Sequence, residues 1–130
     1  MIRTIDVLVV EDRELLQIML TESLIDDGLS VTLAADGTQA MSMLSQEGMD
    51  YRALIVDVNL PGSISGWDVA RRARWLRPTM SVLYVTGYDA TDWIAKGVPG
   101  SQILTKPFAM TTMLMMVSHL ISVSPVSMLH

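Results

Sequence analysis

The chain alternates short apolar runs with helix-like patterns from one end to the other, and this alternation constrains its fold more than any other feature. Runs rich in β-branched residues predict strands at about 5–10, 31–34, 53–57, 82–85 and 102–105. Helices are expected at about 13–26, from Asp36-Gly37 to Gly48, and at 66–76, 90–96 and 108–122. Strands that alternate with helices in this way form parallel sheets. The expected fold is therefore a doubly wound (βα)5 three-layer α/β sandwich.

The same patterns indicate which residues form the core. The run at 53–57 is apolar on both faces, as expected for a central strand of a parallel sheet. The helix at 13–26 carries four apolar residues that we expect to pack on the sheet: Leu15, Ile18, Met19 and Ile25. The last helix should bury a stripe made up of Met110, Met113, Leu114, Val117, Leu120 and Ile121. Beside this stripe, Met115 and Met116 suggest an adaptable docking or dimer surface, the alternative being partial burial in the monomer.

Polar residues close four of the five expected strands. Glu11-Asp12 follow the first strand, Asp57 ends the third, Thr86 follows the fourth, and Lys106 follows the fifth. In open α/β sheets, ligands bind outside the carboxyl ends of the strands, so these side chains should converge on one site. Three carboxylates at such short range are costly unless a cation joins them. The lysine and a divalent metal are the two candidates.

The sequence predicts a metal site built from oxygen ligands. Cysteine is absent and the two histidines are far apart, which excludes thiolate and histidine sites. Asp12 and Asp57 are the expected direct ligands, the backbone carbonyl of Asn59 adds an uncharged oxygen, and Glu11 is expected to act through water. Such a set favours Mg²⁺.

An aspartate beside a divalent cation and a lysine is suited to attack phosphorus, because the two cations offset charge on the phosphoryl oxygens. Asp57 is therefore the predicted nucleophile. Lys106 would pair with Asp57 before phosphorylation and with the phosphoryl group afterwards. The hydroxyl of Thr86 would bind a phosphoryl oxygen, and its change of position would act as a switch.

Charge and hydropathy exclude several classes of function. The net charge of -5 argues against a nucleic-acid partner. Four arginines cluster at Arg71, Arg72, Arg74 and Arg77, and their spacing around a helix predicts a solvated face. No apolar run reaches membrane-spanning length or resembles a signal peptide, so we expect a single cytoplasmic domain with no membrane contact.

Taken in order along the chain, Glu11-Asp12, Asp57, Thr86 and Lys106-Pro107-Phe108 resemble the receiver domains of bacterial two-component response regulators. The resemblance covers nearly the whole chain and implies a flavodoxin-like sheet in the order 2-1-3-4-5. The stretch 83–88 is also similar to receivers that are attached to hybrid histidine kinases or work with them.

The resemblance implies how such a chain works. A histidine kinase or histidine phosphotransfer protein would donate a phosphoryl group to Asp57 with Mg²⁺, and the acyl phosphate would then hydrolyse slowly. The chain would thus catalyse its own modification without being a conventional turnover enzyme. The signal would be carried by the face formed by the helix at 90–96, the strand at 102–105 and the helix at 108–122.

Three features depart from the usual receiver pattern. Ile103 stands three positions before the lysine, where an aromatic residue is usual, so the usual aromatic switch is in doubt. Gly66 comes one residue later than the commonest spacing. We expect residues 1–122 to form the receiver and 123–130 a short C-terminal tail, with no output domain.

Two other functions compete with the phosphoacceptor. A hydrolase with an aspartyl-phosphate intermediate would need a second acid two residues after the nucleophile, where this chain has Asn59. The remaining alternative is a phosphorylation-independent interaction module that keeps the receiver fold.

Overall fold

The computed structural model describes residues 4–87 and 91–123. Within these ranges lie the strands β1 (Asp6–Val10), β2 (Ser30–Ala34), β3 (Tyr51–Asp57), β4 (Ser81–Thr86) and β5 (Gln102–Thr105). The helices are α1 (Glu14–Asp26), α2 (Gly37–Leu44), α3 (Gly66–Leu76), α4 (Thr91–Lys96) and α5 (Met110–Ser122). Each lies close to its predicted position. The stretch 88–90 and, of the predicted tail at 123–130, residues 124–130 fall outside the described residues.

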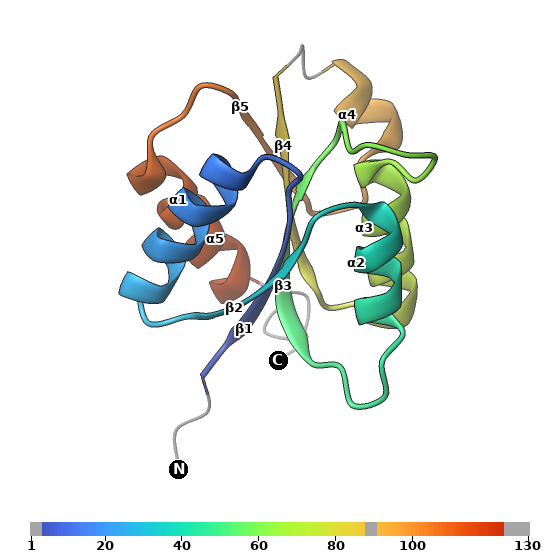
Figure 1. Cartoon of the computed structure of the whole chain (residues 1–130), viewed down its shortest axis with the longest axis horizontal. Helices are drawn as coiled ribbons and strands as arrows, with labels where there is room; N and C mark the ends of the chain where they lie inside the picture. Colours follow the sequence, from blue (N-terminus) through green and yellow to red (C-terminus); the bar gives the residue numbers. More distant parts are fainter. Residues whose placement is uncertain (1–3, 88–90, 124–130) are drawn as a thin grey trace.

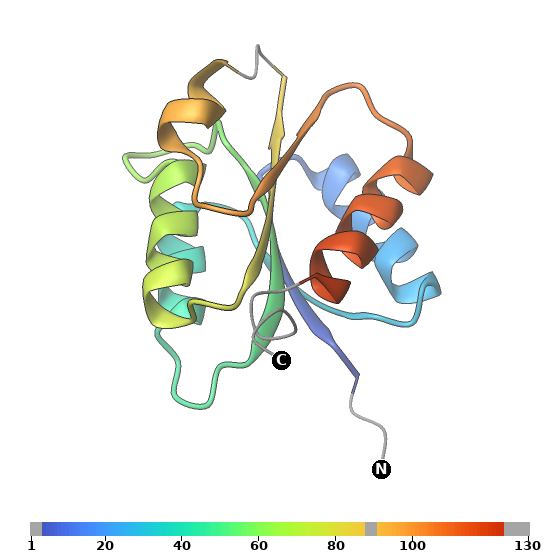
Figure 2. The same cartoon turned by 180° about the vertical axis from the view of Figure 1, so that it is seen from behind.

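The five strands are parallel and form one sheet in the order β2-β1-β3-β4-β5, which confirms the predicted doubly wound, flavodoxin-like fold. Helices α1 and α5 cover one face of the sheet, and α2, α3 and α4 lie on the other (Figures 1 and 2). In the register, Val10 pairs with Val56 and Asp57 pairs with Val85. The carboxyl ends of β1, β3 and β4 are therefore nearly level.

Local signals explain where α2 and α3 begin. Asp36 precedes α2, and its side chain accepts a hydrogen bond from the N–H of Gln39 at 2.8 Å. Ser65 and Asp68 form a capping box at the start of α3, each side chain accepting from the backbone N–H of the other residue. Such caps contribute about 1 kcal/mol each. Gly48, which we expected to end α2, lies in the turn beyond it and adopts a positive φ of 80°.

Each face of the sheet has its own hydrophobic cluster, because successive strand residues point to opposite faces. The cluster under α2 and α3 includes Leu8, Val10, Leu54, Val56, Val82 and Tyr84. The cluster under α1 and α5 includes Val7, Val9, Ala53, Ile55, Leu83 and Val85. Burial of one large aliphatic side chain contributes about 1.5–3 kcal/mol. The two clusters together hold the strand ends in a fixed register.

The prediction for the buried face of α1 is wrong. The four residues expected to pack on the sheet are all exposed: Leu15, Ile18, Met19 and Ile25. Leu15 exposes 71% of its surface. The helix packs instead through a stripe spaced by four residues: Leu16, Leu20 and Leu24. Because α1 is apolar on two sides, helical spacing alone fits either face. Contact with the sheet selects the face with the continuous leucine stripe.

The stripe predicted in α5 is confirmed. Three of its residues are buried, Met113, Val117 and Leu120, and the other three are partly buried against the same cluster. Of the two flanking methionines, Met115 is 73% exposed and Met116 is partly buried. None of the helices in the described ranges has the length and apolar character that a membrane span requires.

The arginines of the α3 region are only partly a solvated face. Arg71 and Arg72 are exposed, as predicted. Arg74 is partly buried and donates hydrogen bonds of 2.6 Å to two backbone carbonyls. Arg77 forms an ion pair with Asp50. Arg74 and Arg77 therefore connect α3 to neighbouring segments.

Candidate functional site

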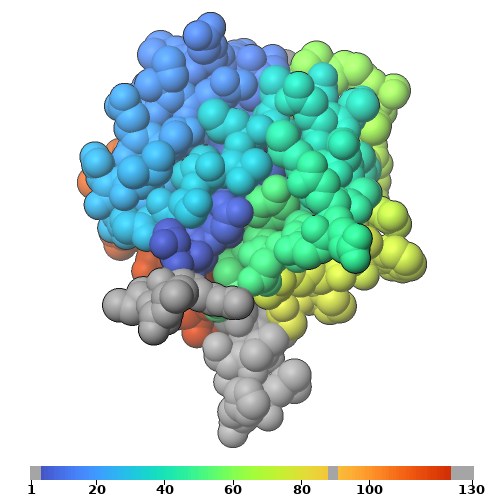
Figure 3. All heavy atoms as spheres, turned by 60° about the horizontal axis from the view of Figure 1, so that its bottom comes forward, coloured from blue at the N-terminus to red at the C-terminus, as the bar shows by residue number. Residues whose placement is uncertain are grey.

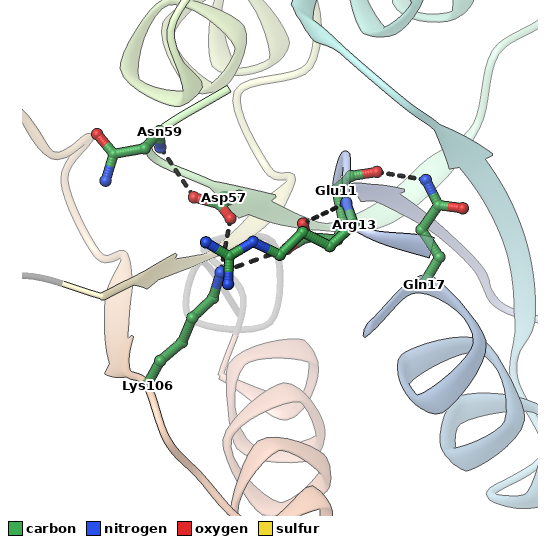
Figure 4. Close-up of polar contacts among 6 residues, drawn as sticks. All are labelled: Glu11, Arg13, Gln17, Asp57, Asn59 and Lys106. Carbon is green, nitrogen blue, oxygen red and sulfur yellow. Dashed lines mark hydrogen bonds and ion pairs between the residues drawn. The ribbon is translucent and has the colours of Figure 1, made fainter. Parts of the chain in front are cut away.

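The carboxyl ends of the strands surround a cleft of about 480 Å³. Its lining consists of Asp12, Arg13, Asp57, Asn59, Gly87, Lys106 and Pro107. Figure 4 shows the side chains of Asp57 and Lys106 pointing toward each other, with Glu11 facing the lysine. The predicted site residues thus come from separate strand ends to one edge of the sheet.

Asp57 is the last residue of the central strand β3 and is 5% exposed. Its Oδ2 accepts a hydrogen bond from Nζ of Lys106 at 2.8 Å, and its Oδ1 accepts one from the backbone N–H of Asn59 at 2.8 Å. Gly66 supports the following loop by donating its N–H to the carbonyl of Val58 at 3.1 Å. A Cβ at Gly66 would overlap the carbonyl oxygen of Asp57. Only glycine therefore lets α3 begin so close to this strand end.

Lys106 links the strand ends. Its backbone N–H donates to the carbonyl of Thr86 at 2.7 Å, which continues the pairing of β4 with β5. Its Nζ lies 2.8 Å from Oδ2 of Asp57 and 3.7 Å from Oε1 of Glu11. The peptide bond to Pro107 is cis. One ammonium group thus faces two buried carboxylates and offsets only part of their combined charge.

Glu11 is almost completely buried, with 1% of its surface exposed. Its Oε2 accepts the backbone N–H of Arg13 at 2.9 Å, and its carbonyl oxygen accepts from Nε2 of Gln17 at 2.5 Å. Burial raises the pKa of Glu11 to about 7, and the Asp57 carboxylate adds to the rise, whereas the Arg13 N–H and Lys106 oppose it. Near neutral pH, a bound proton or a further cation would therefore stabilise Glu11 in its buried position.

A divalent metal is the cation that fits this donor set. One carboxylate oxygen from each of Glu11, Asp12 and Asp57 lies within 4.8 Å of the others. Asp12 is exposed, whereas Glu11 and Asp57 are buried. Hard oxygen donors without sulfur or imidazole suit Mg²⁺. Asn59 lines the same cleft, and the ligand role of its carbonyl stays a prediction.

Thr86 is buried and is the final residue of β4, whereas we expected it to follow the strand directly. Gly87, which follows it, lines the cleft. The structure thus brings Thr86 to the same edge of the sheet as Asp57 and Lys106, and its switch role stays a prediction.

Sequence reasoning assigned no site role to Arg13, Gln17 or Gly66. Arg13 lines the cleft, Gln17 binds the backbone of Glu11, and Gly66 makes room for the end of β3. Arg13 directly follows the acidic pair, and Gln17 lies one helical turn later, so their positions at the start of α1 could have pointed to the first two. The role of Gly66 depends on how α3 meets β3, which local sequence does not encode.

The departure at Ile103 has a structural counterpart on β4. Ile103 is partly buried and pairs with Tyr84 in the sheet. Tyr84 is fully buried, its ring centroid lies 4.6 Å from that of Trp67, and its hydroxyl accepts the backbone N–H of Val98 at 3.1 Å. Aromatic bulk in this part of the sheet therefore comes from β4.

Known proteins resemble this chain in sequence. The sequence matches the response regulator receiver domain family over residues 7–118. The transcriptional regulatory protein TcrA of Mycobacterium tuberculosis is 41% identical over 105 residues, which are 78% of this chain and 40% of TcrA. Response regulator MprA of the same species is 32% identical over 113 residues, which are 85% of this chain and 48% of MprA. The chain thus spans less than half the length of these relatives.

Solved structures show the same fold. A response regulator receiver protein from Sinorhizobium medicae superposes with a TM-score of 0.89 and 32% identity, over 93% of this chain and 97% of that one. The receiver domain of a sensor histidine kinase from Pseudomonas aeruginosa gives a TM-score of 0.76 and 26% identity, over 92% and 99%. That receiver holds a magnesium ion in its active-site cleft.

Proposed function

Because this chain belongs to the response regulator receiver domain family, we propose that Asp57 accepts a phosphoryl group from a phosphohistidine on a histidine kinase or histidine phosphotransfer protein. The observation that carries this proposal is the pairing of Asp57 with Lys106 at 2.8 Å, beside the carboxylates of Glu11 and Asp12. A buried carboxylate at the end of the central strand, with a cation on one side and further oxygen donors on the other, is poised for attack on phosphorus.

In the proposed reaction, a carboxylate oxygen of Asp57 attacks the phosphorus of the phosphohistidine. An O–P bond forms while the P–N bond breaks, and the electron pair of that bond stays on the imidazole nitrogen. Water later attacks the acyl phosphate, releasing inorganic phosphate and restoring the carboxylate. The chain thus promotes its own phosphorylation and dephosphorylation instead of turning over a small substrate.

Lys106 and Thr86 act at different stages of this cycle. Before transfer, Nζ of Lys106 holds Oδ2 of Asp57 in place. After transfer, the same ammonium binds an oxygen of the phosphoryl group, because that group carries more negative charge than the carboxylate did. The hydroxyl of Thr86 then binds a second phosphoryl oxygen. Their backbones are already joined by a hydrogen bond of 2.7 Å, so movement of either residue affects β4 and β5 together.

The receiver family binds Mg²⁺ at its acidic site, and the carboxylates of this chain fit that ion. Bound magnesium would offset negative charge on the carboxylates and on the phosphoryl oxygens. Asp12 and Asp57 would hold it directly, with the carbonyl of Asn59 as a further ligand and Glu11 acting through water. The exposed Asp12 gives the ion a route from solvent.

The output of the switch is proposed to pass through the face formed by α4, β5 and α5. Thr86 ends β4, and Lys106 follows β5 and leads into α5, so both phosphoryl-binding residues border this face. Elsewhere on α5, the exposed Met115 borders a hollow shared with Asp27, the residue that follows α1, and offers an apolar contact there for an effector or a second copy of the chain.

The direct test is the intact mass of the protein after incubation with magnesium and acetyl phosphate. We expect a single phosphoryl adduct in the wild type and none in Asp57→Asn, which keeps the shape of the side chain. The adduct should also be lost when magnesium is removed with a chelator. Wild-type protein that stays folded, binds magnesium and remains unmodified would overturn the proposal and favour a phosphorylation-independent binding module.

A further inference from the structure

Among the arginines in the described ranges, Arg13 alone lines the cleft, and the proposed chemistry has not yet given it a role. Its backbone is fixed at the site, because its N–H donates to Oε2 of Glu11 at 2.9 Å. Its side chain is exposed and extends from the start of α1 toward Asp57 and Lys106 (Figure 4). Arg13 thus combines an anchored backbone with a charged guanidinium group on a side chain that lines the cleft.

The charges around the cleft explain why a second side-chain cation matters. Glu11, Asp12 and Asp57 bring three carboxylates together, and Lys106 already contacts two of them. A divalent metal together with Lys106 would balance the charge of these three carboxylates and leave little positive charge for a further anion. An incoming phosphoryl group brings up to two further negative charges. Within the described residues, no ion pair commits Arg13 to a carboxylate.

We propose that the guanidinium of Arg13 binds the phosphoryl oxygens of the incoming phosphodonor and makes the cleft favour dianionic donors. The planar guanidinium can donate two parallel N–H bonds to a phosphate, which the ammonium of Lys106 cannot do. This inference rests on the proposed transfer to Asp57, and it concerns which donors react and how fast.

The test compares two small donors on wild type, Arg13→Ala and Arg13→Lys at saturating magnesium. With acetyl phosphate, the O–P bond to Asp57 forms as the P–O bond to acetate breaks, and acetate leaves with the electron pair. The second donor, phosphoramidate, carries one net negative charge fewer near neutral pH, because its protonated nitrogen offsets part of the charge on the phosphoryl oxygens. Its P–N bond breaks in the same way, and ammonia leaves. Rates are followed by intact mass.

We expect Arg13→Ala to react about five- to tenfold more slowly with acetyl phosphate at low salt, and less than about twofold more slowly with phosphoramidate. Arg13→Lys should recover part of the rate. Added salt should shrink the difference, because the cleft is open to solvent. Arg72→Ala is the matched control: it removes the same charge from an exposed arginine outside the cleft and should react like the wild type.

A second readout needs no donor. Removing a positive charge beside the acidic cluster should tighten magnesium binding by about two- to threefold in Arg13→Ala, as measured by titration. Equal acetyl phosphate rates in wild type and Arg13→Ala would overturn the inference and leave phosphorylation of Asp57 standing. An equal loss with both donors would overturn the preference for dianionic donors, because Arg13 would then act on both donors alike. A wild type that takes no phosphoryl group would overturn both proposals.

Discussion

The two ends of the sheet carry the same kinds of charged residues in different surroundings. At the carboxyl end, Glu11 and Asp57 are buried and share Lys106. At the amino end, Asp50 pairs with Arg77, and 58% and 28% of their side-chain surfaces are exposed. Figure 3 shows this second end, where the start of β1 in dark blue lies beside the green segment that leads into β3.

The difference teaches that burial, more than charge count, separates a reactive site from an ordinary surface cluster. An exposed ion pair is screened by water and contributes little to stability. A buried carboxylate has lost its hydration, so a proton, a lysine or a metal ion changes its free energy strongly. Asp6, at the amino end, is an intermediate case: partial burial raises its pKa, and hydrogen bonds from Thr32 and Ser30 oppose the rise.

The largest expected effect is the pH dependence set by Glu11. Its pKa is about 7 in the folded chain and 4.5 without the fold, so the folded state holds a proton that the unfolded state releases. The resulting stabilisation is complete below pH 4.5 and is lost as pH rises through 7. It amounts to roughly 3 kcal/mol at most. Urea unfolding without metal from pH 4.5 to 8 should show this loss in the wild type.

Glu11→Gln isolates that contribution, because the amide does not titrate. The free energy of unfolding of the variant should fall less with rising pH than that of the wild type. If the free energies of unfolding of the two proteins changed in parallel with pH, burial of Glu11 would not distinguish the carboxyl end of the sheet from the amino end.

Removing the cation at each end should give the next largest difference. Lys106→Met leaves two buried carboxylates without their shared partner and should lower the free energy of unfolding by about 2 kcal/mol in metal-free protein at pH 7.5. Arg77→Met breaks an exposed pair and should cost less than about 1 kcal/mol. Equal losses of unfolding free energy in both variants, measured by urea unfolding, would contradict the difference between the two ends of the sheet.

Magnesium should produce a smaller effect, confined to one end. At ten times its Kd, the ion should stabilise the wild type by about 1.4 kcal/mol, because it binds the folded state. Asp12→Ala should lose most of this stabilisation, whereas Asp50→Ala should keep it. Thermal unfolding with and without magnesium measures the stabilisation of both variants. Loss of the magnesium stabilisation in Asp50→Ala would place the ion at the amino end of the sheet and contradict the proposed site.

The contrast also shows what sequence could predict. The fold could be predicted from the alternating runs. The convergence of Asp57, Thr86 and Lys106 at one edge of the sheet could be predicted from their places at strand ends, because parallel strands bring those ends together. The buried face of α1 did not follow, because that helix is apolar on two sides and only packing chooses between them. The reach of Arg13 into the cleft likewise depends on how α1 leaves β1.

The most direct test of the central claim is to identify the residue that becomes phosphorylated. Borohydride reduces an aspartyl phosphate to homoserine, and peptide mass spectrometry then locates the change in sequence. After treatment with acetyl phosphate and magnesium, we expect this conversion at position 57 and not at Asp6, Asp12 or Asp50. Conversion at another aspartate, or at none in protein that carries a phosphoryl group, would contradict the assignment of Asp57 as the phosphoacceptor.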